Sequence, residues 1–199
     1  MDAWSLPTSL NVHGVEYPIR TDYRVVLDIL TALNDPEVFK NMTEEEKARE
    51  VAETIIMILY EEPETIPTND LQEALDRACE FIDCGMKPDN KKRPQVMDWK
   101  QDAPIIVPAV NKVSHTDVRS VKYMHWWTFF SLYMEIGNGT FATVVSIRQK
   151  RTKGKKLEKW EMEFYKENKS MIDLAAKKGG KRSTEEQEEL KALFGNCKK

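Results

Sequence analysis

The side chains most able to do chemistry in this chain are its histidines and cysteines, and their spacing does not favour a shared site. His13, His115 and His125 are far apart in the sequence, and Cys79 and Cys84 are five positions apart. That spacing is wider than the Cys-x-x-Cys pair of many zinc sites, and no histidine lies close to it. We therefore expect no metal and no cofactor. The three cysteines show no disulfide framework, which predicts reduced thiols.

Catalytic arrangements are also hard to build from these residues. His125 could act as a general base beside Trp126, but no nucleophile or carboxylate lies at a spacing that completes such a site. Lys153-Gly-Lys-Lys156 lacks the upstream glycine that a phosphate-binding loop requires. We expect His125 to be a packed or helix-capping residue, and we expect the protein not to be an enzyme.

The segment from Tyr123 to Ile136 is the most unusual element that could position a site. As a helix, capped by Thr116 or Asp117 and ended by Gly137, it would carry a wide face of aromatic and methionine side chains. Such a face must be covered by the rest of the domain or by a partner. We expect His125 and Glu135 nearer the surface or in a polar pocket, and five aromatic residues mostly buried: Trp126, Trp127, Phe129, Phe130 and Tyr133.

A second helix is predicted from Lys155 to about Leu174. Its apolar residues have heptad spacing, although two and a half heptads are too few to assert a coiled coil: Leu157, Trp160, Phe164, Met171 and Leu174. Residues 148–160 are strongly basic and include Trp160 as a candidate stacking residue, so a nucleic-acid-binding module is an alternative.

Charge is unevenly distributed along the 199 residues, which are 41% hydrophobic and carry a net charge of −3. Residues 37–83 hold 14 acidic and 4 basic side chains, whereas residues 148–182 hold 13 basic and 5 acidic ones. We predict that these two oppositely charged segments meet, either within one chain or between two copies. No apolar run is long enough for a membrane span, and no signal peptide is evident at the start.

The periodicity predicts a mainly α protein, a helical bundle with a short N-terminal β-hairpin over residues 10–19. Helices are predicted over residues 22–33, 43–60 and 69–85, and another begins at Thr140. A further helix is predicted over 99–113, interrupted by Pro104 and Pro108. The predicted units are an acidic N-terminal part (1–85), a linker (86–98), an aromatic and basic part (99–175), and a tail with a short helix (176–199).

Several motifs resemble the tailed-bacteriophage family known as "gene product fifteen", found in siphophages and prophages of Gram-positive hosts. They include His125-Trp-Trp-Thr-Phe129, Lys153-Gly-Lys-Lys-Leu-Glu158 and Tyr17-Pro-Ile-Arg-Thr-Asp-Tyr-Arg24, and the resemblance covers roughly residues 8–175. It implies a gene among the tail genes, near the gene of the tape-measure protein. The implied function is that of a non-catalytic tail assembly chaperone in the host bacterial cytoplasm, without membrane association.

The resemblance implies the tape-measure protein as partner, with the tail-tube subunit, a companion chaperone or a second copy of the chain as further partners. The predicted contact residues are four aromatic side chains with a charged rim: Trp126, Trp127, Trp160 and Phe164, then Arg148, Lys155 and Lys156. Besides the nucleic-acid-binding module, a minor structural virion component is an alternative.

Overall fold

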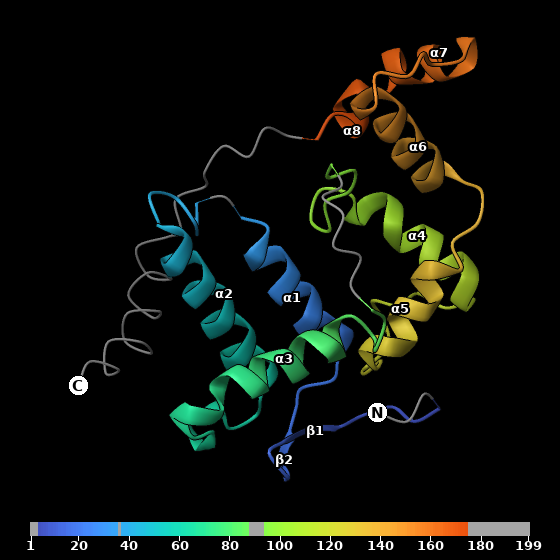
Figure 1. The fold of residues 1–199 in the computed structure, drawn as a ribbon. Helices are drawn as coiled ribbons and strands as arrows, with labels where there is room; N and C mark the ends of the chain where they lie inside the picture. Colours follow the sequence, from blue (N-terminus) through green and yellow to red (C-terminus); the bar gives the residue numbers. More distant parts are fainter. Residues whose placement is uncertain (1–3, 36, 88–93, 175–199) are drawn as a thin grey trace.

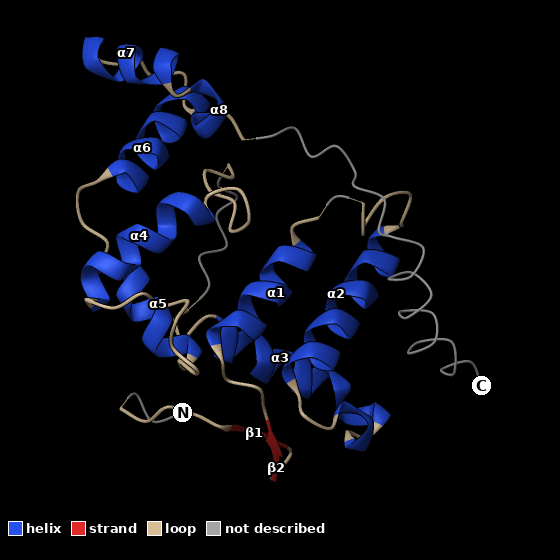
Figure 2. Cartoon of the chain, turned by 180° about the vertical axis from the view of Figure 1, so that it is seen from behind, coloured by secondary structure: helices blue, strands red, loops and turns tan. Residues whose placement is uncertain are grey.

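The computed structural model describes residues 4–35, 37–87 and 94–174, which form a two-stranded hairpin and a set of α-helices (Figures 1 and 2). The mainly α class with a short N-terminal hairpin is confirmed. The elements, in order, are β1 Ser9–Val12, β2 Val15–Pro18, α1 Tyr23–Leu33, α2 Glu44–Leu59, η1 Pro63–Thr65, η2 Thr68–Asp70, α3 Leu71–Ile82, α4 Ala103–Ser114, α5 Trp126–Met134, α6 Thr140–Thr152, α7 Lys159–Glu167 and α8 Lys169–Ile172. The predicted tail helix and residues 88–93 of the predicted linker lie outside the described residues.

The hairpin forms where the sequence predicts it. Its two-residue turn has positive φ at both His13 and Gly14, the pattern that matches the twist of the flanking strands. Leu10 pairs with Tyr17, and both Leu10 and Val12 are buried in the core. Strand β1 therefore covers one end of the helices. Besides its partner strand β2, it contacts α3.

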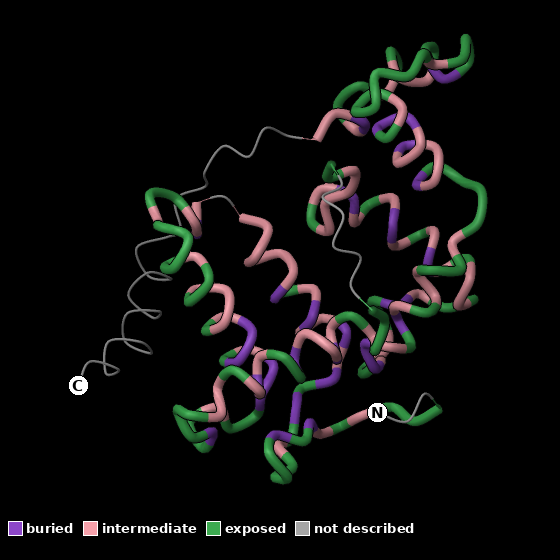
Figure 3. Tube along the Cα trace, viewed as in Figure 1, coloured by how far each residue is buried: buried purple, intermediate pink, exposed green. Residues whose placement is uncertain are grey.

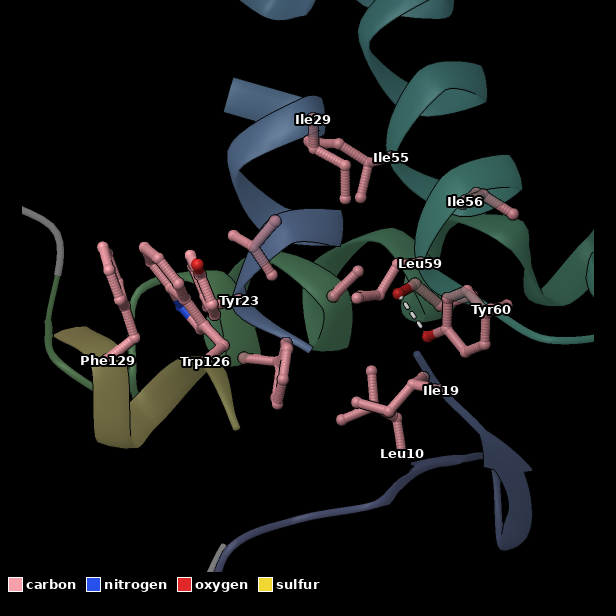
Figure 4. Packing of buried hydrophobic residues seen from close by; sticks show 14 of the residues in the cluster. Leu10, Ile19, Tyr23, Ile29, Ile55, Ile56, Leu59, Tyr60, Trp126 and Phe129 are labelled. Atoms are coloured by element: carbon pink, nitrogen blue, oxygen red, sulfur yellow. Dashed lines mark hydrogen bonds between the residues drawn. The ribbon is translucent and has the colours of Figure 1, made fainter. Parts of the chain in front are cut away.

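The starts of α1 and α2 follow their capping residues. The Asp22 carboxylate accepts from the amide of Arg24, and Thr43 and Glu46 form a reciprocal capping box. Helices α1, α2 and α3 then pack through small and branched apolar side chains drawn in Figure 4, among them Ile29, Ile55 and Leu59.

Helix α4 is continuous despite its two prolines. Pro104 lies in the first turn, where a backbone N–H has no intrahelical acceptor, so it disrupts nothing. Pro108 lies inside the helix and removes the amide that would donate to the Pro104 carbonyl. The missing amide of Pro104 and the missing hydrogen bond from residue 108 to the Pro104 carbonyl both affect only the first turns of α4. The helix therefore extends to Ser114 and ends at His115, which adopts a left-handed conformation.

Helix α5 is shorter than predicted, since it begins at Trp126 and not near Thr116. The Asp117 carboxylate accepts hydrogen bonds from the backbone amide and the guanidinium of Arg119, and the Asn111 side-chain oxygen accepts from the amide of Val118. These local bonds hold residues 116–121 in turns that compete with a helix. The helix starts only where His125 can cap it, with its Nδ1 accepting from the amide of Trp127.

Of the two places predicted for His125, the surface is excluded, because the side chain is buried, and both ring nitrogens have polar partners. Its Nδ1 is an acceptor, so the proton lies on Nε2, which donates to the Pro7 carbonyl at 3.0 Å. The packed, helix-capping role predicted for this histidine is confirmed. Glu135, as predicted, is exposed.

One hydrophobic core cluster contains residues from both sides of the predicted linker. Tyr23 of α1 stacks on Phe129 of α5, with ring centroids 4.3 Å apart, and Trp126 lies beside them (Figure 4). The indoles of Trp126 and Trp127 donate to the carbonyls of Ile82 and Phe81 at the end of α3. The boundaries of the predicted units stay a prediction.

Candidate functional site

The seven predicted contact residues lie in three different environments. Trp126 is fully buried in the core, and Trp127 is half-buried against the end of α3. Phe164 is half-buried against a small second cluster made by Val144, Ile147 and Ile172. Arg148 is buried, and the three exposed residues are Trp160, Lys155 and Lys156.

The prediction that Arg148 forms part of a charged rim was wrong. Its side chain is 4% exposed and pairs with Asp102, which is 1% exposed, through two bonds of 2.6 and 2.8 Å. The guanidinium also donates to the carbonyls of Val96, Met171 and Ile172. Every donor direction of the planar group is used, which is the arrangement that allows a buried arginine to remain charged.

This buried pair joins four segments that are distant in the sequence. Asp102 lies at the start of α4, Arg148 lies in α6, and the carbonyl acceptors belong to residues 94–98 and to α8. The pair therefore fixes α6 and α8 against α4, and so sets where α7 begins. The pair thereby positions α7, which lies between α6 and α8 in the sequence.

The prediction of a single helix over residues 155–174 was wrong. Residues 153–158 are a loop in which Gly154 has a φ of +62°, and the helical stretch is divided at Asn168 into α7 and α8. Glu158 and Glu161 form a capping box that starts α7 at Lys159. The heptad spacing consequently spans a loop, a helix and a break, and it does not create a single apolar stripe.

Helix α7 is held by the side that carries Glu161 and Tyr165. Both carboxylate oxygens of Glu161 lie 2.8 Å from the ammonium of Lys150 on α6, and one also accepts from the amide of Glu158. The hydroxyl of Tyr165 donates to Asp173, and the Arg151 guanidinium lies over the Tyr165 ring. These polar contacts orient α7 and leave its opposite side outward.

We call the exposed lysines and apolar side chains of the outward side and the preceding loop the α7 surface: Lys155, Lys156, Lys159, Trp160, Met162 and Lys166. The exposed Glu158, Glu163 and Glu167 lie among them. All six side chains of the α7 surface are exposed, and Trp160 is 57% exposed. In Figure 3, the loop before α7 is mostly exposed, and α7 itself has exposed positions on both sides of its buried and intermediate ones. An open hollow beside the helix is lined by side chains of both charges and by two apolar ones: Lys156, Leu157, Glu158, Lys159, Met162, Glu163 and Lys166.

Such a surface is suited to binding more than to chemistry. A large exposed tryptophan is costly in water, and tryptophan is enriched at the centres of protein interfaces. Lysines around it can bury their alkyl stems against a ligand while their ammonium groups stay in water. The α7 surface therefore presents one exposed indole with lysines and glutamates around it.

The oppositely charged segments do not meet through ion pairs in the part of the chain that the structure describes. The described pairs of the basic segment are Arg148 with Asp102, Lys150 with Glu161, and Arg151 with Asp173. Figure 1 shows α7 at the opposite end of the molecule from α2 and α3. The prediction that the segments meet within one chain is wrong for the described residues, and a meeting between two copies stays a prediction.

We expect acid to release α7 from α6. The hydrogen bonds from Lys150, followed by that from the Glu158 amide, hold the pKa of Glu161 below its usual range. Because the pKa of Glu161 is lower in the folded than in the unfolded chain, its ionised form stabilises the folded state at pH values above the unfolded pKa. This contribution is lost as the pH falls through the folded pKa. Amide hydrogen exchange of α7 in the wild type should therefore accelerate below about pH 4. In the Glu161→Gln variant, α7 should already exchange fast at pH 7. Equal exchange of the wild type and the variant at pH 7 would contradict this role.

The sequence did not reveal Asp102, Glu161 or Tyr165 as positioning residues. One signal was present, because Glu158 and Glu161 have the spacing of a capping box immediately before an apolar position. Asp102 carried no such signal, since its partner Arg148 is 46 positions away.

Among the described residues, no group of three or more histidine, cysteine or acidic side chains could hold a metal ion. Their helices include none long and apolar enough to cross a membrane.

The described residues form a mainly helical protein with an exposed tryptophan among lysines on α7. A family model described as bacteriophage Gp15 protein matches residues 4–174, so the chain belongs to that family and is a phage-related protein. Neither the curated proteins nor the solved structures compared with it gave a match.

Proposed function

We propose that this protein is a tail assembly chaperone that binds the tape-measure protein of its phage in the host cytoplasm, without catalysis. The observation that carries the proposal is the exposed Trp160, placed among lysines on a helix that is fixed from behind by buried polar contacts. Membership of the Gp15 family supports it, together with the tail-gene position that the sequence resemblance implies.

The α7 surface suits a helical client. An amphipathic helix can lay an apolar side chain against Trp160 and Met162 while its carboxylates face Lys155 and Lys156. The tryptophan supplies most of the binding free energy, and the lysines raise the association rate and select an acidic segment. Arg148 acts behind this surface by keeping α6 and α8 in place, whereas Trp126 packs in the main core.

The direct test is co-expression of the full chain with the downstream tape-measure protein. The wild type should keep the client soluble and co-purify with it. Replacing Trp160 by alanine should weaken binding by roughly 30-fold, the equivalent of about 2 kcal/mol for a central interface tryptophan. Trp4→Ala is the matched control, because Trp4 is 97% exposed and belongs to the other end of the chain.

Three results would overturn the proposal. They are equal client binding by Trp160→Ala and the wild type, normal tails formed by a phage that lacks the gene, and stoichiometric amounts of the protein in purified virions. The last result would favour the alternative of a minor structural component.

A nucleic-acid-binding module is the second candidate, and the observation that favours it is the proximity of Lys155, Lys156 and Lys159 to an exposed tryptophan. Single strands bind surfaces that combine cations with stacking faces. Fluorescence polarisation with a labelled single-stranded oligonucleotide tests it. This function requires affinity that falls steeply with salt and is lost in Trp160→Ala.

A further inference from the structure

The link between α5 and α6 contains Asn138-Gly139, the one Asn-Gly pair in the sequence. In such a pair the asparagine side chain can react with the main chain, because glycine has no Cβ to block the approach of its amide nitrogen to the preceding carboxamide. Residues 137–140 are all exposed, and the exposed link can be followed in Figure 3. The reactive pair therefore lies where solvent reaches it.

Nothing in the described part of the chain holds the two reacting groups. The Asn138 carboxamide has no hydrogen-bond partner there, and neither does the amide of Gly139. Gly139 precedes the first turn of α6, so its amide lies outside the hydrogen-bond ladder of that helix. A Cβ built on Gly139 would meet no heavy atom within 4 Å, so the space beside its amide is open.

The other described asparagines lack this combination of features. Four of them make side-chain hydrogen bonds within the protein: Asn11, Asn34, Asn111 and Asn168. Asn41 and Asn69 are exposed, but the amides that follow them donate to the carbonyls of Phe39 and Pro67. Asn138 is thus the described asparagine whose side chain and following amide are both free to react.

We propose that Asn138 is a self-modification site, at which the folded chain converts this asparagine to isoaspartate and aspartate without an enzyme. The Gly139 amide nitrogen attacks Cγ of Asn138 and forms a new C–N bond. The side-chain amino group leaves as ammonia, taking the proton of that amide, and a cyclic succinimide remains. Water then opens the ring: addition at Cγ gives aspartate, and addition at the main-chain carbonyl gives isoaspartate. Water is the only co-reactant.

The reaction changes the link and leaves the helix contacts in place. It adds one carboxylate immediately before α6, so the formal net charge changes from −3 to −4. Negative charge is favourable at a helix N-terminus. Isoaspartate also adds one carbon to the main chain, but α6 keeps its own anchor, since Arg148 stays paired with Asp102. The modified chain therefore stays folded, and the proportion of modified copies records the time since their synthesis.

Incubation of the full chain at mildly alkaline pH, followed by trypsin digestion and mass spectrometry, tests the site. The tryptic peptide 123–148 contains Asn138 as its single asparagine and no glutamine, so the mass gain of an amide converted to a carboxyl reports this reaction alone. Peptide 41–47 contains the exposed Asn41 and is the internal control. The rate should rise with pH, because the attacking nitrogen must lose its proton. A methyltransferase specific for isoaspartate should label the first peptide and not the second.

Gly139→Ala is the matched variant, because the φ of 167° is extended backbone that any residue adopts and the added Cβ has free space. It should react at least roughly ten-fold more slowly, a rise of about 1.4 kcal/mol in the activation barrier. Asn138→Gln, which would have to form a larger ring, should show no mass gain over the same period. Circular dichroism checks that both variants fold.

A free peptide of residues 134–144 gives the rate without the fold, and the folded wild type should react within about ten-fold of it. The proposal is overturned by a wild type slower than that limit, by equal rates in the wild type and Gly139→Ala, or by equal mass gains in peptides 123–148 and 41–47. All of these results concern the link between α5 and α6, so the chaperone proposal stands or falls separately.

Discussion

Replacing Arg148 by methionine should lower the free energy of unfolding by about 3–5 kcal/mol, the range observed when one member of a buried ion pair is removed. The Asp102 carboxylate would keep its 1% exposure and lose both hydrogen bonds to the guanidinium. The carbonyls of Met171 and Ile172 would lose a donor at the same time. Urea denaturation followed by circular dichroism measures the loss.

Two further variants separate the buried charge from simple loss of contacts. Arg151→Met removes the exposed pair with Asp173 and should cost no more than about 1 kcal/mol. Arg148→Met/Asp102→Leu removes both charges and should recover part of the stability lost by the single variant. An Arg148→Met protein as stable as the wild type would show that the guanidinium does not hold α6 and α8 in place.

Replacing Trp126 by alanine should lower the free energy of unfolding by roughly 3–5 kcal/mol, as for other large aromatic residues removed from a core. The indole packs beside Phe129 and Phe130 and is 1% exposed, so its removal leaves a cavity lined by rings. It also leaves the Ile82 carbonyl without the indole donor. The midpoint and slope of urea denaturation measure the change.

Trp160→Ala is the matched control for stability, because the same substitution at a 57% exposed position should change the free energy of unfolding by less than about 1 kcal/mol. Opposite results, with Trp160 important for stability and Trp126 neutral, would reverse the assignment of core and surface. The pair of variants thus tests both the aromatic core and the α7 surface.

The parts of the fold that could be predicted depend on interactions between near neighbours. The hairpin follows from a short alternating segment around Gly14, and the start of α2 follows from Thr43 and Glu46. These signals act within a few residues, so a single sequence contains them. The same reasoning predicted that His125 would cap or pack, since no catalytic neighbour was in view.

The errors arose where distant residues decide the outcome. The sequence shows Arg148 as one of many cations, and only the fold brings Asp102 to it from 46 positions away. Helix α5 was predicted too long because Asp117 and Asn111 hold the preceding residues in turns. Heptad spacing indicated that Trp160 would face a seam, whereas the break at Asn168 and the buried Glu161 turn α7 so that Trp160 faces outward.

For the candidate site, the sequence predicted three residues that the α7 surface contains: Trp160, Lys155 and Lys156. It could not separate them from Trp126, because both tryptophans lie in amphipathic segments and burial is a property of the assembled helices. The residues that orient the surface, such as Tyr165 with Asp173, become visible only when α7 and α8 are placed together.

The indole bonds to the end of α3 bear on the order in which this chain can fold during its synthesis. The carbonyls of Phe81 and Ile82 receive donors from Trp127 and Trp126, which leave the ribosome more than forty residues later. The amide of Tyr23 likewise donates to the Met124 carbonyl, which is synthesised about a hundred residues later. Contacts this distant in sequence slow folding, because a long loop must close before they form. The nascent N-terminal helices therefore expose the apolar side of α1 until α5 emerges, and translation sets the earliest moment at which the core can close.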